Sequence, residues 1–213
     1  MNSTQHSRTR KADEPLASVL ASKALAAVVI YFVLHPDRAL HFRALQRVTR
    51  VSSRSLQHEI ARLEALGMVR RERDGRLVRY RAVAGHPRWS VLRQMIREFA
   101  HPAEVLRVAL AEVSGIEAAF IFGSFARGDT HAESDVDVFV LSDRMDYEDD
   151  RLDLAEATLE SSALLNREVN AIRYTPEKLA RRSSGGFLRS VLAGSKMWLV
   201  GDHTVLECGE EVL

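Results

Sequence analysis

Apolar residues recur at helical spacing through the first half of the chain. Residues 16–34 are rich in Ala, Leu and Val and contain neither Gly nor Pro, which predicts one helix that ends before Pro36. Two shorter amphipathic segments follow at 42–48 and 53–66, with a turn between them. The apolar stripe of the second segment consists of Leu56, Ile60, Leu63 and Leu66.

The pattern then changes to two short strands around a turn. Residues 68–73 and 76–81 flank an Asp-Gly dipeptide that is typical of a tight hairpin, and both strands are rich in arginine. Helical periodicity returns over residues 89–113, with a break near Pro102. This last stretch is expected either to form a dimer contact or to pack on a core.

Helix, short helix, turn, amphipathic helix and basic hairpin is the element order of a winged helix-turn-helix. Residues 16–84 resemble the bacterial winged-helix regulators of the arsenical-resistance-repressor type. The resemblance implies that the third helix enters the major groove of double-stranded DNA and that the hairpin contacts the backbone or minor groove. The DNA-facing residues that it implies are Ser53, Arg54, Ser55, Gln57, His58 and Arg62 in the third helix, and Arg71, Arg73, Arg76 and Arg79 in the hairpin.

These residue types suit the two kinds of DNA contact. The arginines would neutralise phosphates, whereas Arg54, Gln57 and His58 are the candidates for reading base edges. No cysteine pair accompanies the module, which excludes thiol-based metal sensing. Winged helices also bind proteins, so a protein partner is the alternative.

The second half of the chain alternates strands with polar turns. Residues 116–122 have the pattern of a buried strand, which leads through Gly123-Ser124 into a short helix and directs backbone N–H groups at an anion such as phosphate. On the next predicted strand Asp135 and Asp137 are two residues apart, so their side chains share one face of the sheet. Two carboxylates together with phosphate oxygens are a usual way of holding Mg²⁺.

The Gly-Ser turn, Gly128 and the Ser-Asp-x-Asp sequence at 134–137 resemble the nucleotidyltransferase superfamily of DNA polymerase beta, in particular its minimal branch. The resemblance covers about residues 115–201. It implies that the glycine and serine hold the triphosphate of an NTP, that the aspartates bind Mg²⁺ or Mn²⁺, and that a third carboxylate activates the attacking hydroxyl. The residues assigned in this way are Gly123, Ser124, Arg127 and Ser134 for the nucleotide, Asp135 and Asp137 for the metal, and Asp135, Asp137 and Glu168 for catalysis.

The chain departs from this family at the third carboxylate. In the predicted strand 167–174 that position falls on Asn170, which can neither act as a base nor supply a negative metal ligand. Glu168 lies on the same face and is the candidate substitute. Two alternatives stay open: a weakened or substrate-assisted transferase, and a domain that binds nucleotides without transferring them. Arg127 is likewise either a phosphate ligand or an exposed helix arginine.

Charge divides the chain near its middle. Residues 1–100 hold 19 Lys and Arg against 8 Asp and Glu, whereas residues 101–213 hold 11 against 21, so net charges of +11 and −10 make up the total of +1. A basic half suits a polyanion and an acidic half suits metal ions, although two such halves can also simply attract each other.

The single cysteine, Cys208, excludes an intramolecular disulfide and a cysteine-based zinc site. Since the longest apolar run, 24–34, is eleven residues, we expect no membrane segment and a cytoplasmic protein.

The chain is therefore expected to be an α+β protein, with an N-terminal winged helix-turn-helix and a C-terminal nucleotidyltransferase-fold mixed sheet with flanking helices. The expected divisions are a disordered basic tail at 1–15, a DNA-binding domain at 16–86, linker or dimerisation helices at 87–113, a nucleotidyltransferase-like domain at 114–205 and a tail at 206–213.

The expected function is transcription regulation by a homodimer on paired DNA half-sites. Its second domain would bind an NTP with Mg²⁺, as a ligand sensor or a slow transferase. The alternative is a nucleotidyltransferase enzyme that modifies a protein, an RNA or a small molecule, as toxin-neutralising minimal nucleotidyltransferases do. A pure interaction scaffold is the weakest reading, because the aspartate pair would then have no role.

Overall fold

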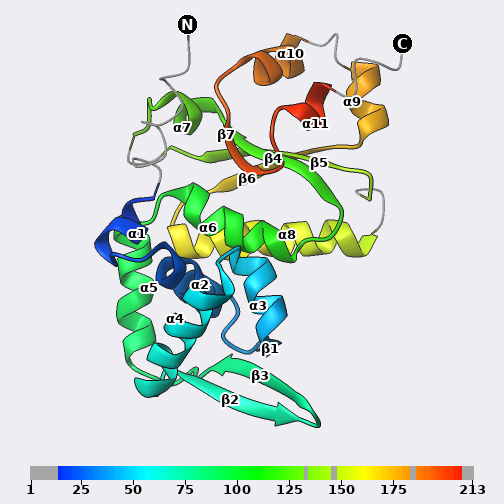
Figure 1. The fold of residues 1–213 in the computed structure, drawn as a ribbon. Coiled ribbons are helices and arrows are strands. Elements are labelled where there is room, and N and C mark those ends of the chain that lie inside the picture. The colour runs from blue at the N-terminus through cyan, green and yellow to red at the C-terminus, as the bar shows by residue number, and fades with distance from the viewer. Residues whose placement is uncertain (1–13, 132–133, 145–147, 183–185, 208–213) are drawn as a thin grey trace, which may run out of the picture. The chain divides into compact units, whose positions relative to one another are not determined.

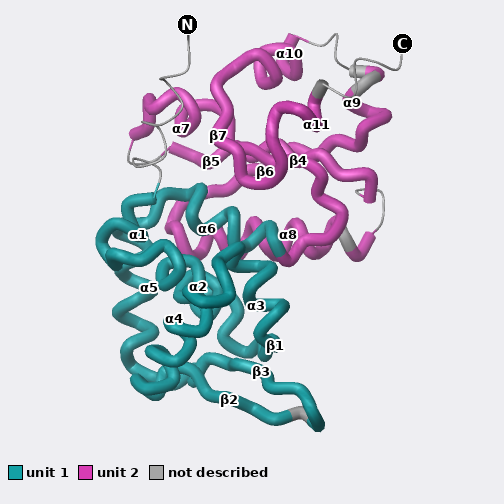
Figure 2. Tube along the Cα trace, viewed as in Figure 1, with its two compact units in different colours: residues 1–111 teal, residues 112–213 magenta. Residues whose placement is uncertain are grey.

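The computed structural model describes residues 14–131, 134–144, 148–182 and 186–207. The chain divides into two compact units, residues 1–111 and 112–213 (Figure 2). Most of the two predicted tails, at 1–13 and 208–213, lies outside the described residues. None of the helices in the described part is long and apolar enough to cross a membrane.

The first unit is mainly helical and carries one small sheet (Figure 1). Its elements are α1 (Pro15–Val19), α2 (Lys23–Leu34), β1 (Leu40–His41), α3 (Phe42–Thr49), α4 (Ser53–Ala65), β2 (Val69–Asp74), β3 (Leu77–Ala82), α5 (Arg88–Phe99) and α6 (Pro102–Ala109). The strands form an antiparallel sheet of order β1-β3-β2. The predicted hairpin is β2 and β3, whereas the two-residue β1 is too short to leave a pattern in the sequence.

Helix α2 is the centre of this unit. It is apolar on every side, and ten of its twelve residues are buried, because α1, α3, α4, α5 and α6 all pack against it. The single helix predicted over residues 16–34 is wrong, since the chain breaks at Ala21 with a left-handed φ of 53°. Ser22 then caps α2 by accepting a hydrogen bond from the N–H of Leu25 at 3.0 Å. Its hydroxyl also donates to the buried Glu59 of α4 at 2.7 Å, so a tertiary contact holds the break.

The predicted short helix, turn and amphipathic helix are α3, its exit turn and α4. Arg50 ends α3 in the left-handed conformation, with a φ of 54°. Ser52 caps α4 by accepting a hydrogen bond from the N–H of Ser55 at 3.1 Å. The apolar stripe of α4 is buried over its first three members, but Leu66 is 43% exposed because α4 ends at Ala65.

A buried carboxylate ties α1 to α6. Glu104 lies in the first turn of α6 and is 7% exposed. Its oxygens accept hydrogen bonds from the backbone N–H groups of Leu16, Ala17 and His101, at 3.3, 3.0 and 2.8 Å. Backbone N–H groups at the start of a helix have no hydrogen-bond partner inside that helix. The Glu104 carboxylate supplies the missing acceptors at the starts of α1 and α6, and we call these three hydrogen bonds the Glu104 clamp. Burial raises the pKa of Glu104 although the three hydrogen bonds favour its ionised form, so the clamp holds a desolvated charge.

The second unit is built around a four-stranded sheet. Its elements are β4 (Ile116–Phe122), α7 (Gly123–Arg127), β5 (Val136–Ser142), α8 (Glu148–Leu165), β6 (Val169–Tyr174), α9 (Pro176–Arg182), α10 (Gly186–Ala193), β7 (Met197–Val200) and α11 (Thr204–Glu207). The strand order is β6-β5-β4-β7, with β5 and β6 parallel and the other pairs antiparallel. The fold is therefore α+β with a mixed sheet, as predicted.

Helices cover both faces of this sheet. Figure 1 shows α9, α10 and α11 on one face and α8 on the other. The core under α9 and α10 is aromatic: the Phe139 ring stacks between those of Phe120 and Tyr174, with centroids 4.8 and 5.5 Å away. Helix α8 was not anticipated from the sequence, although its buried side chains, among them Leu154 and Leu164, close the opposite face.

We expect Glu104→Ala to lower the free energy of unfolding by about 1–3 kcal/mol, because buried N–H donors lose their acceptor. Glu104→Gln keeps one acceptor oxygen and should lose less. Because the pKa of Glu104 is raised in the folded protein, the stability linked to this proton is fully present below the unfolded pKa and is lost as the pH rises through the folded pKa. Urea unfolding across a pH series measures both effects. Equal losses in the free energy of unfolding for Glu104→Ala and Glu104→Gln would contradict the stabilising role of these hydrogen bonds.

Candidate functional site

The sheet of the second unit changes from apolar to polar at one end. Phe139 on β5 faces the aromatic core, and Asp137 lies two residues before it on the same face. Asp137 is the register partner of Phe122 on β4 and of Asn170 on β6. Register partners project from the same face of a sheet. A carboxylate and an amide thus lie on neighbouring strands where the core ends.

Gly123 brings the backbone of β4 against that carboxylate. Its φ is +73°, a conformation that favours glycine. A Cβ atom added there would lie 2.8 Å from Oδ2 of Asp137, so any side chain at this position would displace the carboxylate. Ser124 follows in the single turn of α7, and both residues are half-buried. The predicted Gly-Ser turn and the second aspartate are therefore immediate neighbours.

The two aspartates interact electrostatically. Asp135 is exposed just before β5, and Asp137 is half-buried at its start. Burial raises the pKa of Asp137, and the negative charge of Asp135 raises it further. A divalent cation would remove this repulsion, and carboxylate oxygens are the ligands that Mg²⁺ prefers. The donor set therefore fits a cation shared by Asp135, Asp137 and oxygens of a bound ligand.

The third predicted catalytic residue is Glu168. It is exposed and lies just before β6, where its carbonyl accepts a hydrogen bond from the N–H of Val136 at 2.8 Å. Within the described ranges, no three His, Cys, Asp or Glu side chains are grouped so that they could hold a metal ion. Asn170, by contrast, is paired in register with Asp137. The neighbour of the aspartate pair on β6 is thus an amide.

An arginine that the sequence did not single out braces the loop before β5. Nη1 of Arg167 donates to the carbonyl oxygens of His131 and Ser134 at 3.3 and 3.2 Å. Its guanidinium also lies over the Phe125 ring of α7, 5.6 Å from the centroid. The Ser134 hydroxyl is used within the same loop, where it accepts from the His131 N–H at 2.8 Å. Arg167 therefore positions the segment that carries Ser134 and Asp135.

A cavity of about 340 Å³ opens beside Gly123. Its lining comes from the β4–α7 junction and from α10 and its exit, and consists of Phe122, Gly123, Arg127, Phe187, Ser190, Val191, Gly194 and Ser195. The Phe187 ring is 62% exposed and stands edge-on to that of Phe122, with centroids 6.3 Å apart. Arg127 is also exposed, and its Nε lies 3.3 Å from Oδ2 of Asp129. In the sequence, the apolar residues of 187–192 predict a short helix at the place of α10. Nothing in that pattern indicates that this helix lines a cavity beside Gly123.

Lys196 directly follows the lining residues Gly194 and Ser195. Its ammonium group donates to the carbonyl oxygen of Leu192 and, at 3.1 Å, to that of Gly194. It also lies 5.6 Å from the centroid of the Phe120 ring. Burial lowers the pKa of Lys196. A cation at the end of α10 satisfies carbonyl groups that the helix leaves open, and so orders the 194–195 turn.

In the first unit, the predicted DNA-facing residues of α4 lie mostly on its solvent side. Ser53, Arg54, Gln57, His58 and Arg62 are exposed and Ser55 is half-buried. Arg62 lies 3.8 Å from the buried Glu59. The opposite side of α4 carries the buried apolar stripe, so the polar residues form one continuous exposed face.

The four hairpin arginines differ in their surroundings. Arg73 and Arg76 are exposed near the hairpin turn, and Arg79 is half-buried. Arg71 bonds Glu64 of α4 through Nε and Nη2, at 3.2 and 3.1 Å, and lies over the Tyr80 ring. It thus links the hairpin to α4, while Arg73 and Arg76 extend into solvent.

Comparison with known families identifies one part of the chain. The family model described as a nucleotidyltransferase domain matches residues 104–194, a span that contains the Gly-Ser turn, both aspartates and Asn170. No curated protein matches the chain. The match agrees with the resemblance drawn from these residues, and it supports NTP binding or nucleotidyl transfer by this part of the chain.

We expect Asp137→Asn to raise the thermal unfolding midpoint of the ligand-free protein at neutral pH. The pKa of Asp137 is raised, so its ionised form disfavours the folded state, and wild-type stability falls as the pH rises through the folded pKa. The neutral amide of the variant does not titrate, so the variant does not lose stability in this way as the pH rises. Its higher unfolding midpoint should therefore disappear below the ordinary carboxyl pKa of 3.8. Unfolding curves at several pH values test this, with the exposed Asp143→Asn as control. A lower midpoint for Asp137→Asn at neutral pH would refute the electrostatic interpretation.

Proposed function

We propose that this protein is a DNA-binding transcription regulator whose second unit binds an NTP together with Mg²⁺ or Mn²⁺. The observation that carries the nucleotide part is the close approach of Gly123 to the Asp137 carboxylate beside Asp135, inside the matched nucleotidyltransferase domain. Bound nucleotide would act as a sensed ligand or as the substrate of a slow transfer.

Each group has a distinct part in this proposal. Asp135 and Asp137 hold the cation, which neutralises triphosphate charge and, in a transfer, stabilises the entering and leaving oxygens. The Gly123-Ser124 turn and Arg127 contact the phosphates, and Arg167 holds Ser134 and Asp135 in place. The cavity of about 340 Å³ beside Gly123 is within the usual size range of small-molecule sites and receives the nucleoside.

The residue on β6 that stands at the position of the third carboxylate favours nucleotide sensing over rapid nucleotidyl transfer. Asn170 is the register partner of Asp137, and an amide cannot take a proton from an attacking hydroxyl. The nearest carboxylate along that strand is Glu168, which is exposed and two residues away. We therefore propose nucleotide binding as the principal activity, with any transfer slowed or assisted by the acceptor itself.

The runner-up is an enzyme that transfers a nucleotidyl group to a protein, an RNA or a small molecule. The observation in its favour is that the aspartate pair is held next to an open cavity despite the repulsion that raises the pKa of Asp137. In that case the first unit guides the acceptor to the site. Incubation of labelled NTPs with cell extract tests transfer: an enzyme gives a labelled product that Asp135→Asn abolishes, whereas a protein that only senses nucleotides gives none.

DNA binding by the first unit is supported by the exposed polar face of α4, the solvent-directed Arg73 and Arg76, and the +11 charge of residues 1–100. This combination would give salt-dependent binding to double-stranded DNA. The homodimer and the two-fold operator stay part of the proposal and depend on the sequence resemblance alone. The cytoplasmic location also stays part of it and depends on the single cysteine and the lack of a long apolar run in the sequence.

We expect a saturating NTP with Mg²⁺ to stabilise the folded protein, by about 2.7 kcal/mol at a hundred times its dissociation constant. Thermal unfolding with each of the four NTPs, with and without Mg²⁺, measures this. The Asp135→Asn, Asp137→Asn double variant should lose the shift, and Asp143→Asn should keep it. Absence of a shift with every nucleotide would refute nucleotide binding and leave the DNA-binding proposal standing alone.

We expect Arg73→Ala and Arg76→Ala each to weaken binding to all DNA sequences and to reduce the slope of log affinity against log salt by about 1, because each removes one phosphate contact. Gel-shift titrations at several salt concentrations measure the slope. Arg151→Ala, an exposed arginine of the second unit, is the matched control. If the wild type binds no DNA at low salt, or if the slopes stay equal, the proposed role of the hairpin is wrong.

A further inference from the structure

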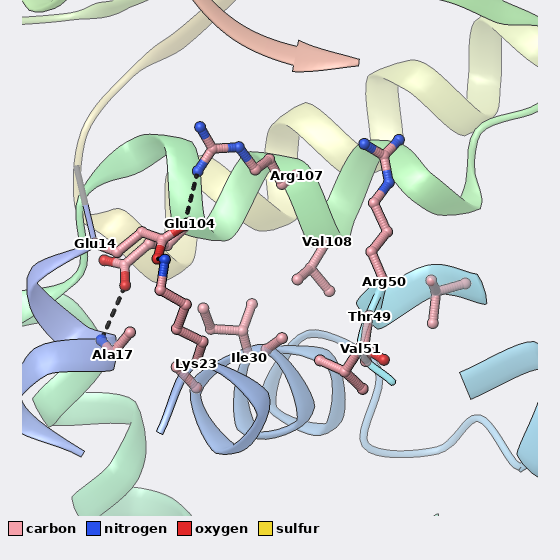
Figure 3. A pocket seen from close by; sticks show the side chains of 13 residues that line it. Glu14, Ala17, Lys23, Ile30, Thr49, Arg50, Val51, Glu104, Arg107 and Val108 are labelled. Atoms are coloured by element: carbon pink, nitrogen blue, oxygen red, sulfur yellow. Dashed lines mark hydrogen bonds and ion pairs between the residues drawn. The ribbon is translucent and has the colours of Figure 1, made fainter. Parts of the chain in front are cut away.

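A second cavity lies within the first unit, and none of the proposed nucleotide- or DNA-contacting residues lines it. It encloses about 210 Å³ and is shown in Figure 3. Its walls come from the residues around α1, the first half of α2, the exit turn of α3 and the middle of α6. They consist of Glu14, Ala17, Lys23, Ala26, Ala27, Ile30, Val48, Thr49, Arg50, Val51, Glu104, Arg107 and Val108.

The floor of the cavity is apolar. Ile30 and Val48 are 1% exposed, and Val108 closes the α6 side. The wall formed by α2 is made of the small side chains of Ala26 and Ala27, which leave the space open. Protein interiors are normally filled to crystal-like density. A preformed apolar hollow is the kind of surface that takes the hydrocarbon part of a small molecule.

The rim carries three cations and two carboxylates. Glu104 accepts three backbone hydrogen bonds, as described above. Glu14 pairs with Lys23 and lies 3.7 Å from Arg107. Both carboxylates lie at one end of the cavity, whereas Arg50 stands at the other end (Figure 3). The rim therefore has a net positive charge, which favours an anionic group on the ligand.

The cavity also touches the turn that precedes α4. Thr49, Arg50 and Val51 all line it, and the next residue, Ser52, caps α4. Arg50 has a φ of 54°, and a left-handed backbone at a residue other than glycine is strained. A ligand in the cavity would contact this strained turn and so bias the position from which α4 starts.

We propose that this cavity binds a small organic anion, a carboxylate with a compact hydrocarbon body such as an aromatic ring, and that binding changes the affinity of the first unit for DNA. The ligand places its hydrocarbon part against Ile30, Val48 and Val108 and its carboxylate near Arg50, at the end of the cavity away from Glu14 and Glu104. The binding site stands on the cavity alone, while the regulatory effect depends on the DNA binding proposed above. By linkage, DNA changes the affinity for the anion by the same factor.

Benzoate is the test ligand, and its neutral analogue benzamide is the control for charge. Isothermal titration of the full chain should show benzoate binding at millimolar concentration and benzamide binding at least about tenfold more weakly. Ala27→Phe, which fills the hollow, should abolish binding. Arg50→Gln should weaken it by at least about tenfold, and the exposed Arg43→Gln should leave it unchanged.

The site is refuted if the wild type does not bind benzoate. It is also refuted if the Ala27→Phe variant is folded by circular dichroism and still binds benzoate. Equal binding of benzamide refutes the anionic assignment. Should Ala27→Phe fail to fold, Arg50→Gln compared with Arg43→Gln decides the case. DNA titrations with and without saturating benzoate test the regulation: equal affinities overturn it while the site stands. A protein that binds benzoate and no DNA refutes only the proposed DNA function.

Discussion

The candidate nucleotide site depends on the register of β5 between its two neighbours. That register places Asp137 beside Phe122 on β4 and beside Asn170 on β6. Because side chains alternate between faces, a shift of one residue would turn Asp137 away from the site and bring Val136 or Val138 onto it. The stacked rings of Phe120, Phe139 and Tyr174 hold the register. The apolar core of the second unit thus determines where its polar chemistry lies.

The same arrangement lowers the stability of the ligand-free protein. Asp137 is half-buried, next to the charge of Asp135, and against a glycine backbone that leaves no room for another side chain. Such a pair disfavours the folded state until a cation or a ligand compensates it. An aspartate pair kept against this cost is better explained by binding than by stability. What it lacks is a third carboxylate in register, since β6 offers Asn170 there.

The first unit uses buried carboxylates for a different purpose. Glu59 of α4 accepts a hydrogen bond from the Ser22 cap of α2, and Glu104 of α6 accepts three from backbone N–H groups. Both tie helix starts to distant helices and so organise the elements around α2. The cavity beside Glu104 lies where α2 presents alanines and where α3 turns sharply at Arg50. The cavity thus borders both the Glu104 hydrogen bonds and the turn that leads to α4.

Local patterns in the sequence determined most of the elements and the chemistry of the candidate site. Apolar spacing and the Asp-Gly turn placed α3, α4 and the hairpin, and Gly123, Ser124 and the two aspartates indicated the phosphate and metal chemistry. These features are legible because helix and strand periodicity and turn preference act over a few residues. Only the tertiary structure decided the break at Ala21, the bracing by Arg167, the cavity wall from α10 and the register that pairs Asn170 with Asp137. Each of these depends on contacts between residues that lie far apart in the chain, where no local pattern records them.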